Sequence, residues 1–217
     1  MHIIPVGIAC SIWTTRCVSK TTHLGFQILL TTFLAALNSY IYATFFDSKA
    51  VLSKSSGTDL LKLQIESELA YYIGYGVLEV IDRNALLTVH HIVASSLILF
   101  AYSCEYYQII SLFLFLFTVS NPPLALARYA RHTKHNQLAT ISFFLFAVVF
   151  FVFRICMVAL MLKSTLTTSI TKIEPELYVV GNSILVTLYG MQLYWFLKIM
   201  RILLEKLSVM FDIVYCI

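Results

Sequence analysis

The sequence predicts an all-α, polytopic membrane protein with six to seven transmembrane helices arranged around an internal cavity. Of its 217 residues, 59% are hydrophobic and only 12% are charged, and the mean hydropathy is +0.84. Soluble domains carry about twice that charged share. Several apolar runs also approach or exceed about 20 residues, the length of helix that crosses a hydrocarbon core of about 30 Å. Composition and run length together place the chain in a membrane.

Five apolar runs have the length of a membrane span: Leu24 to Phe46, Leu86 to Cys104, Gln108 to Arg128, Leu138 to Leu162, and Leu177 to Met200. A sixth run, Ser67 to Ile81, is shorter and contains Glu79. Its glycines Gly74 and Gly76 are small, which lets neighbouring helices approach closely. We therefore expect an inner helix that the other helices cover, preceded by a polar loop from Asp47 to Glu66.

Residues 1–15 decide between six and seven helices. They are apolar for only about a dozen positions, fewer than a full span requires, and they lack the basic leader of a signal peptide. Three interpretations of this segment are left open: a short first helix, a segment at the membrane surface, or the end of a truncated helix. Residues 16–204 then form one transmembrane domain, and residues 205–217 form a short cytosolic tail.

The basic residues set the expected orientation, because cytosolic loops carry an excess of lysine and arginine. With the C-terminus in the cytosol and seven spans, the cytosolic side receives Arg16, Lys20, Arg83, Arg128, Arg131, Lys134, Lys198, Arg201 and Lys206. The opposite side receives the smaller set Lys49, Lys54, Lys62, Lys163 and Lys172. We therefore predict a cytosolic C-terminus.

Net charge and cysteine spacing exclude other classes of protein. The net charge of +4 is spread over short clusters, whereas nucleic-acid binding needs a concentrated basic face. The five cysteines are scattered, without a CxxC pair or the spacing of metal ligands. We expect no nucleic-acid partner, no bound metal and no cofactor.

Two adjacent histidines, His90 and His91, lie in the apolar run LLTVHHIVASSLILF. Successive residues of a helix point about 100° apart, so at least one of the two must face the inside of the bundle. A neutral imidazole can donate or accept a hydrogen bond, or act as a nucleophile or general base. Two roles of the pair are left open: a structural one, in which the histidines form hydrogen bonds to neighbouring helices, and a functional one. The pair lacks the further ligands that a zinc site needs.

Ionisable side chains inside a span are costly and are therefore candidates for function. Glu79 and Asp82 lie three residues apart near the end of one helix, and Arg83 follows. The alternatives here are a Glu79–Arg83 ion pair at the membrane surface and a carboxylate that faces the histidines across the short turn. Arg154, in FVFRICMVAL, lies deep in a span. It must find an acid or carbonyl groups on another helix, with Glu79 as one candidate, or else extend its charge toward the interface.

The segment Ser120-Asn121-Pro122-Pro123 interrupts the run from Gln108 to Arg128. Proline has no N–H group and disrupts the preceding turn, so backbone carbonyls lose their partners in mid-membrane. Such a break is tolerated where protein or a cavity satisfies those carbonyls. The sequence predicts a kinked helix here, which either lines an internal cavity or is purely structural.

Four segments follow one another in a particular order. The first, TRCVSKTTH, contains Arg16, Val18, Ser19 and His23; the second joins SELAYYIGYGVLEVI to HHIVASSLILFAYSC; the third is SNPPLALARYARH; the fourth, LYGMQLYWFLKIMRIL, contains Gln192, Tyr194, Trp195, Phe196 and Lys198. In this order, from Arg16 to Leu204, they resemble the TLC-domain family, which includes ceramide synthases and TRAM-type translocation proteins. The resemblance implies a multi-pass protein of the endoplasmic reticulum or another endomembrane.

In ceramide synthases, paired histidines and two later aspartates carry acyl transfer from acyl-CoA to a sphingoid amine. The resemblance assigns the histidine half of that pattern to His90 and His91. The two aspartate positions fall on Thr118 and Asn121, and neither is a carboxylate. An amide cannot stabilise the charge of an imidazolium as a carboxylate does. The resemblance therefore favours lipid binding over catalysis.

We expect a protein that binds or senses lipid and contributes to membrane-lipid homeostasis or trafficking. The alternative is an acyl-CoA-dependent N-acyltransferase of a sphingoid-type amine, with His90 or His91 as the catalytic residue and acyl-CoA as substrate. The residues expected in the lipid cavity or polar core are His23, Glu79, Asp82, Thr118, Ser120, Asn121, Arg154, Gln192 and Trp195. Membrane lipids are the expected partners, and assembly into a homo-oligomer or hetero-oligomer is left open.

Overall fold

The computed structural model describes residues 19–45, 57–167 and 175–215, and it is 92% helical, without a strand in these ranges. Within them, five helical segments are long and apolar enough to cross a membrane: Lys20–Thr44, Ala85–Ser103, Tyr107–His132, Asn136–Thr167 and Tyr178–Lys206. The predicted all-α, polytopic class is therefore confirmed. Residues 1–15, Arg16, Val18, Lys49, Lys54 and Lys172 lie outside the described residues.

The first two described helices are α2 (Lys20–Phe45) and α3 (Asp59–Ile81). Helix α3 begins eight residues before the predicted Ser67, so the prediction of a loop as far as Glu66 is wrong. The hydroxyl of Thr58 caps the helix by accepting the backbone N–H of Leu61 at 3.3 Å. The added turns are kept helical by burial, because Leu61, Gln64 and Ile65 all face the interior.

Helix α4 (Ala85–Ser103) returns beside α3 after a short turn. Arg83 takes a left-handed conformation in that turn, with φ of 56°, and the side chain of Asn84 caps α4 by accepting the N–H of Leu87 at 3.4 Å. A Cβ atom built on Gly76 of α3 would lie 3.1 Å from Cβ of His91. The predicted close approach of helices at this glycine is thus confirmed, and it brings α3 against the histidines.

The predicted break in the run from Gln108 to Arg128 is also confirmed. Helix α5 (Tyr107–Thr118) ends before the prolines and α6 (Asn121–His132) begins at Asn121. Pro122 and Pro123 lie in the first turn of α6, where a missing N–H costs nothing.

The last two predicted runs differ from the structure in detail. The run Leu138 to Leu162 is α7 (Asn136–Val149), a π-helix η1 (Phe150–Met157) and α8 (Val158–Thr167). Helix α9 (Pro175–Tyr215) has 41 residues, about 60 Å at 1.5 Å per residue, and runs past the predicted end at Met200. The predicted tail from residue 205 therefore continues the helix as far as Tyr215.

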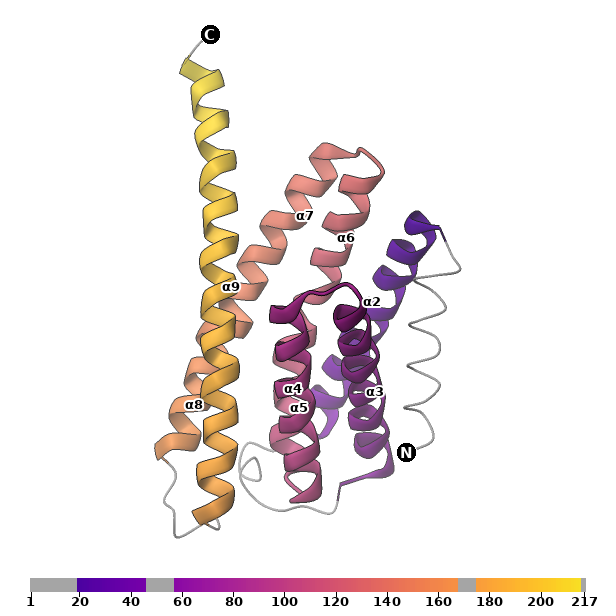
Figure 1. Cartoon of the computed structure of the whole chain (residues 1–217), viewed down its shortest axis with the longest axis vertical. Helices are drawn as coiled ribbons and strands as arrows, with labels where there is room; N and C mark the ends of the chain where they lie inside the picture. The colour runs from indigo at the N-terminus through magenta and orange to yellow at the C-terminus, as the bar shows by residue number, and fades with distance from the viewer. Residues whose placement is uncertain (1–18, 46–56, 168–174, 216–217) are drawn as a thin grey trace.

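The ends of the helices form two groups (Figure 1). The start of α2, the α3–α4 turn and the α6–α7 turn lie toward the end of the bundle from which the C-terminal part of α9 projects. The α4–α5 turn, the end of α8 and the start of α9 lie at the opposite end. Lys20, Arg83, Lys134 and Lys206 thus share one end of the bundle, as the predicted orientation requires, while Lys163 near the end of α8 belongs to the other.

A core of buried apolar side chains joins α2, α3, α4, α5, α8 and α9, including Ile41, Ile65, Ile98, Leu114 and Leu188. Many large apolar side chains instead face outward, among them Leu29, Phe33, Ile141 and Leu197. Such an apolar exterior suits lipid surroundings rather than water.

Candidate functional site: a polar core and an apolar pocket

The two histidines lie where α3, α4 and α9 meet. His90 is buried, which confirms that at least one of the pair faces the interior. Its ring lies edge-on to Trp195 of α9, with ring centroids 4.8 Å apart, and 5.4 Å from the ring of His91. The ring of Tyr72 on α3 lies 5.7 Å from that of His91 and 6.3 Å from that of His90. The imidazoles are therefore enclosed by aromatic rings from two other helices.

Several buried polar atoms of the histidines and of Gln192 lack a hydrogen-bond partner in the described part of the chain. The Nδ1 atoms of His90 and His91 are buried and lack a hydrogen-bond partner among the described residues, and so do both amide atoms of Gln192, three residues before Trp195. Leaving a buried polar group unpaired costs about 1–3 kcal/mol. Such groups are rare in folded proteins and need an explanation, of which a functional role is one.

A buried carboxylate that the sequence reasoning did not single out lies in α3. Glu68 is 1% exposed, and its Oε1 accepts a hydrogen bond of 2.5 Å from the Asn38 amide and one of 3.2 Å from the Thr118 hydroxyl. Gln64 in turn donates to Oδ1 of Asn38, and the Ser111 hydroxyl donates to Gln64 at 3.3 Å. This Glu68 network ties α2, α3 and α5 together through hydrogen bonds between side chains.

Thr118 occupies one of the two positions at which the resemblance calls for a carboxylate, and its hydroxyl contacts a carboxylate from another helix. Tyr72, beside both histidines, is one helical turn after Glu68 on α3. The second carboxylate oxygen of Glu68 is buried without a partner in the described part of the chain. The fold therefore brings the carboxylate of Glu68 to Thr118, a position at which α5 itself has no acidic residue.

Arg154 donates hydrogen bonds to acceptors that lie at the break between α5 and α6. Its guanidinium donates to the backbone carbonyl of Phe117 and, at 2.5 Å, to Oδ1 of Asn121. It lies between the rings of Phe117 and Phe150, at 5.3 and 5.2 Å from their centroids. Arg154 belongs to η1, and π-helical turns are frequently found at functional sites. Arg154 is therefore bound by acceptors at the α5–α6 break. It is not paired with Glu79, which lies near the end of α3.

Glu79 and Asp82 lie at the α3–α4 turn, toward the end of the bundle that carries Lys20, Arg83, Lys134 and Lys206. Asp82 is exposed, Glu79 is half-buried, and neither makes a hydrogen bond with the described His90 or His91. Glu79 has Asp82 and Arg128 as its charged neighbours and forms no ion pair with Arg83, although the structure describes both residues.

His23 and Ser120 complete the predicted set. Nε2 of His23 lies 3.3 Å from the Gln27 amide on the same helix. Ser120 is fully buried at the α5–α6 break, and its hydroxyl has no partner among the described residues. The described residues hold no group of three or more His, Cys, Asp or Glu side chains placed to bind a metal ion.

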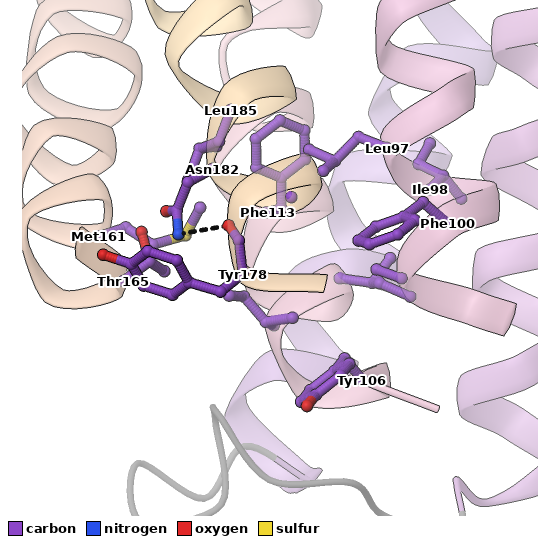
Figure 2. Close-up of a pocket in the computed structure, with 14 residues that line it drawn as sticks. Leu97, Ile98, Phe100, Tyr106, Phe113, Met161, Thr165, Tyr178, Asn182 and Leu185 are labelled. Atoms are coloured by element: carbon purple, nitrogen blue, oxygen red, sulfur yellow. Dashed lines mark hydrogen bonds between the residues drawn. The ribbon is translucent and has the colours of Figure 1, made fainter. Parts of the chain in front are cut away.

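A pocket lies at the other end of α4, between α4, α5, α8 and α9 (Figure 2). Its cavity volume is about 90 Å³, and it is open on one side. Its lining is apolar apart from a few uncharged polar side chains, and comprises Leu97, Ile98, Phe100, Ala101, Tyr106, Ile109, Ile110, Phe113, Met161, Thr165, Tyr178, Gly181, Asn182 and Leu185. No charged side chain is among these described residues. The sequence reasoning did not find this pocket, because no polar motif marks it.

The polar side chains of the pocket are held by backbone carbonyls. The Asn182 amide nitrogen donates to the carbonyl of Tyr178 at 2.9 Å, the bond drawn in Figure 2. The Tyr178 hydroxyl donates to the carbonyl of Leu166 at 2.8 Å, and the Thr165 hydroxyl to that of Leu162 at 3.0 Å. Oδ1 of Asn182 is buried and has no partner among the described residues.

Comparison with models of protein families identifies the family of this chain. A family model described as the TLC domain, of the TRAM, LAG1 and CLN8 proteins, matches residues 9–201. No curated protein matches the sequence significantly. The matched range covers nearly the whole chain and contains both the polar core and the pocket. The chain therefore belongs to the TLC-domain family of membrane proteins.

Proposed function

We propose that this protein binds or senses a membrane lipid within its helical bundle, and that it thereby contributes to lipid homeostasis or trafficking in the endoplasmic reticulum or another endomembrane. The observation that carries the proposal is the apolar pocket between α4, α5, α8 and α9. Ligand sites are typically concave and mostly apolar, with a few placed polar groups, and this pocket has both properties.

The position of the pocket favours an acyl chain. Its lining on α5 runs from Tyr106 to Phe113, about 10 Å along a helix at 1.5 Å per residue, and begins where the span itself begins. The helices around it cross a membrane, so the molecules next to its open mouth are lipids. An acyl chain that enters from the bilayer exchanges lipid contacts for contacts with Leu97, Phe113 and Leu185.

We propose that the polar core and the pocket lie in different leaflets. Basic residues collect at the end of the bundle that carries the histidines, and the positive-inside rule assigns that end to the cytosol. The pocket then belongs to the opposite leaflet. His90 and Leu97 are seven residues apart, so the polar core and the pocket are about 10 Å apart along α4.

A second candidate function is acyl transfer from acyl-CoA to a long-chain amine. One observation favours it: Glu68 brings a buried carboxylate to Thr118, one turn from the tyrosine beside His90 and His91. In that reaction an imidazole nitrogen attacks the thioester carbonyl and the CoA thiolate leaves. The amine then attacks the acyl-imidazole, an amide forms, and a proton is released as the imidazole leaves.

Lipid extraction from purified protein tests the first proposal. The protein is isolated from membranes in mild detergent, and its lipids are compared with the bulk membrane by mass spectrometry. We expect one enriched lipid class, and we expect Leu97→Trp, which fills the pocket, to remove it. Leu99→Trp is the matched control, because Leu99 lies on the same helix and is 38% exposed. Bulk lipid alone, or the same enrichment in Leu97→Trp, would contradict the proposal.

A further inference from the structure

We infer that the α6–α7 turn and the outer face of α7 bind an anionic phospholipid of the surrounding membrane, and that Arg131, Lys134 and Lys206 hold its headgroup. The site is separate from the apolar pocket and does not depend on the proposed function. It follows from a cluster of exposed cations that lies directly beside an outward-facing apolar surface.

The three cations gather at the start of α7, and all three are exposed. Arg131 lies in the last turn of α6, and Lys134 lies in the α6–α7 turn. Lys206 comes from α9, and its Nζ donates at 3.4 Å to the hydroxyl of Thr140 in the first turns of α7. Two segments far apart in the sequence thus bring positive charge to the same end of one helix.

Acidic side chains do not balance this charge within the described part of the chain. The sequence contains no Asp or Glu from residue 106 to residue 173, so α6 and α7 carry none. Glu205 on α9 forms an ion pair with Arg201 at 3.0 Å, and none of the three cations makes an ion pair with a described residue. Exposed lysine and arginine groups at a membrane surface attract anionic headgroups.

The outward face of α7 continues from these cations into the membrane. Four large apolar side chains on it are exposed and recur at helical spacing on one side: Leu138, Ile141, Leu145 and Val148. The first of them follows Lys134 by four residues. From residue 138 to residue 148 the helix rises about 15 Å, about half of the hydrocarbon core. A lipid of one leaflet can therefore lay its acyl chains along this face and place its headgroup at Lys134.

This continuity favours a lipid over a soluble acidic partner. The ammonium group of Lys206 lies 5.9 Å from the centroid of the Phe143 ring, within the range of a cation–π contact, so the charge is anchored beside the apolar face. A nucleic acid or an acidic protein would contact the cations from the aqueous side and leave that face unused. A phospholipid matches both parts of the surface. The positive-inside rule assigns this end of the bundle to the cytosol, whose leaflet carries anionic lipids.

Native mass spectrometry of the purified full-length protein in detergent tests the inference. The two probes are dioleoylphosphatidylglycerol and dioleoylphosphatidylcholine, which share their chains and their phosphate and differ in net charge. We expect tighter binding of phosphatidylglycerol, by about fivefold in affinity for each cation that contacts the headgroup. The preference should shrink as the concentration of ammonium acetate rises, because salt screens exposed charges.

Two matched variants locate the site. Lys134→Gln/Lys206→Gln should lose the preference for phosphatidylglycerol. Lys20→Gln/Arg83→Gln removes two exposed cations from the same end of the bundle and should keep the preference, because Arg83 directly follows Asp82 and both lie away from α7. Equal losses in the two double variants would show that total charge, and not this site, attracts the lipid.

The remaining outcomes separate this inference from the proposed function. Equal affinity of the wild type for the two probes would overturn the headgroup site and leave the pocket untouched, and this comparison does not depend on the folding of any variant. Leu97→Trp, which fills the pocket, should keep the preference, and its loss in that variant would overturn the placement on α7. A polyglutamate peptide or an RNA oligonucleotide that binds more tightly than phosphatidylglycerol would overturn the choice of a lipid.

Discussion

The hydroxyl of Thr118 on α5 donates a hydrogen bond of 3.2 Å to the carboxylate of Glu68 on α3, fifty residues away in the sequence. Asn38 on α2 donates to the same oxygen. One buried acid therefore holds three helices at a position where the resemblance to ceramide synthases calls for an acid on α5 itself. The arrangement connects the stability of the bundle with the chemistry of its polar core.

Removing the carboxylate should destabilise the bundle. Glu68→Ala leaves Asn38 and Thr118 without their acceptor, at a cost of about 1 kcal/mol per lost interhelical hydrogen bond. We expect a lower midpoint of thermal unfolding in detergent. The midpoint is measured by size-exclusion chromatography of samples heated to a series of temperatures. Glu68→Gln keeps an acceptor oxygen and should lose less. Equal midpoints for the wild type and Glu68→Ala would show that the network does not hold the helices.

Arg154 should be as important for folding as Glu68, because it donates hydrogen bonds to acceptors at the break between α5 and α6. Arg154→Met leaves the Phe117 carbonyl and the Asn121 side chain without their donor, at a cost of about 1–3 kcal/mol for each buried group left unpaired. We expect a clear fall in the unfolding midpoint and in yield. Arg128→Met, an exposed position on α6, is the control and should unfold like the wild type. Similar losses in both variants would point to total charge rather than the break.

Cysteine labelling in the α4–α5 and α6–α7 turns tests the proposed orientation. Glu105 and Lys134 are both exposed, and both have φ of 63°. In a background without native cysteines, Lys134→Cys should react with an impermeant maleimide from the cytosolic side only, and Glu105→Cys from the opposite side only. The reverse pattern would invert the assignment of the two leaflets.

We expect no acyl transfer by the purified protein. Given acyl-CoA and a sphingoid base, it should form no N-acyl product above the level of its His91→Ala variant, measured by mass spectrometry. Lipid that co-purifies in the pocket should be unchanged in that variant. Product formation that His91→Ala abolishes would favour the acyltransferase function instead, with Glu68 as the residue that positions the imidazole.

The membrane spans are predictable from sequence because run length and hydropathy are local properties. The predicted run Leu24 to Phe46 ends within one residue of α2, and the prolines at 122 and 123 correctly mark the break. The start of α3 is not predictable in the same way. Residues 59–66 mix polar and apolar side chains, and their helix depends on the Thr58 cap and on burial of Gln64 among other helices.

The site is harder to predict than the spans. The burial of His90 follows from two adjacent polar residues in an apolar helix, but the role of Glu68 depends on Asn38, thirty residues away. Glu68 does carry a signal once α3 is known to begin at Asp59, because Gln64, Glu68 and Tyr72 then lie on one face. The pocket has no such signal, since it arises from the spacing of four helices.

Photocross-linking of lipids inside the bundle tests directly whether the pocket holds a membrane lipid. Cells fed a diazirine fatty acid carry the probe in their membrane lipids, and adducts on the protein are mapped by mass spectrometry after illumination. We expect adducts on the pocket residues Phe113 and Met161 that Leu97→Trp removes, with adducts on the outward-facing Ile141 unchanged. Adducts confined to outward-facing residues such as Ile141, and equal in the wild type and Leu97→Trp, would contradict it.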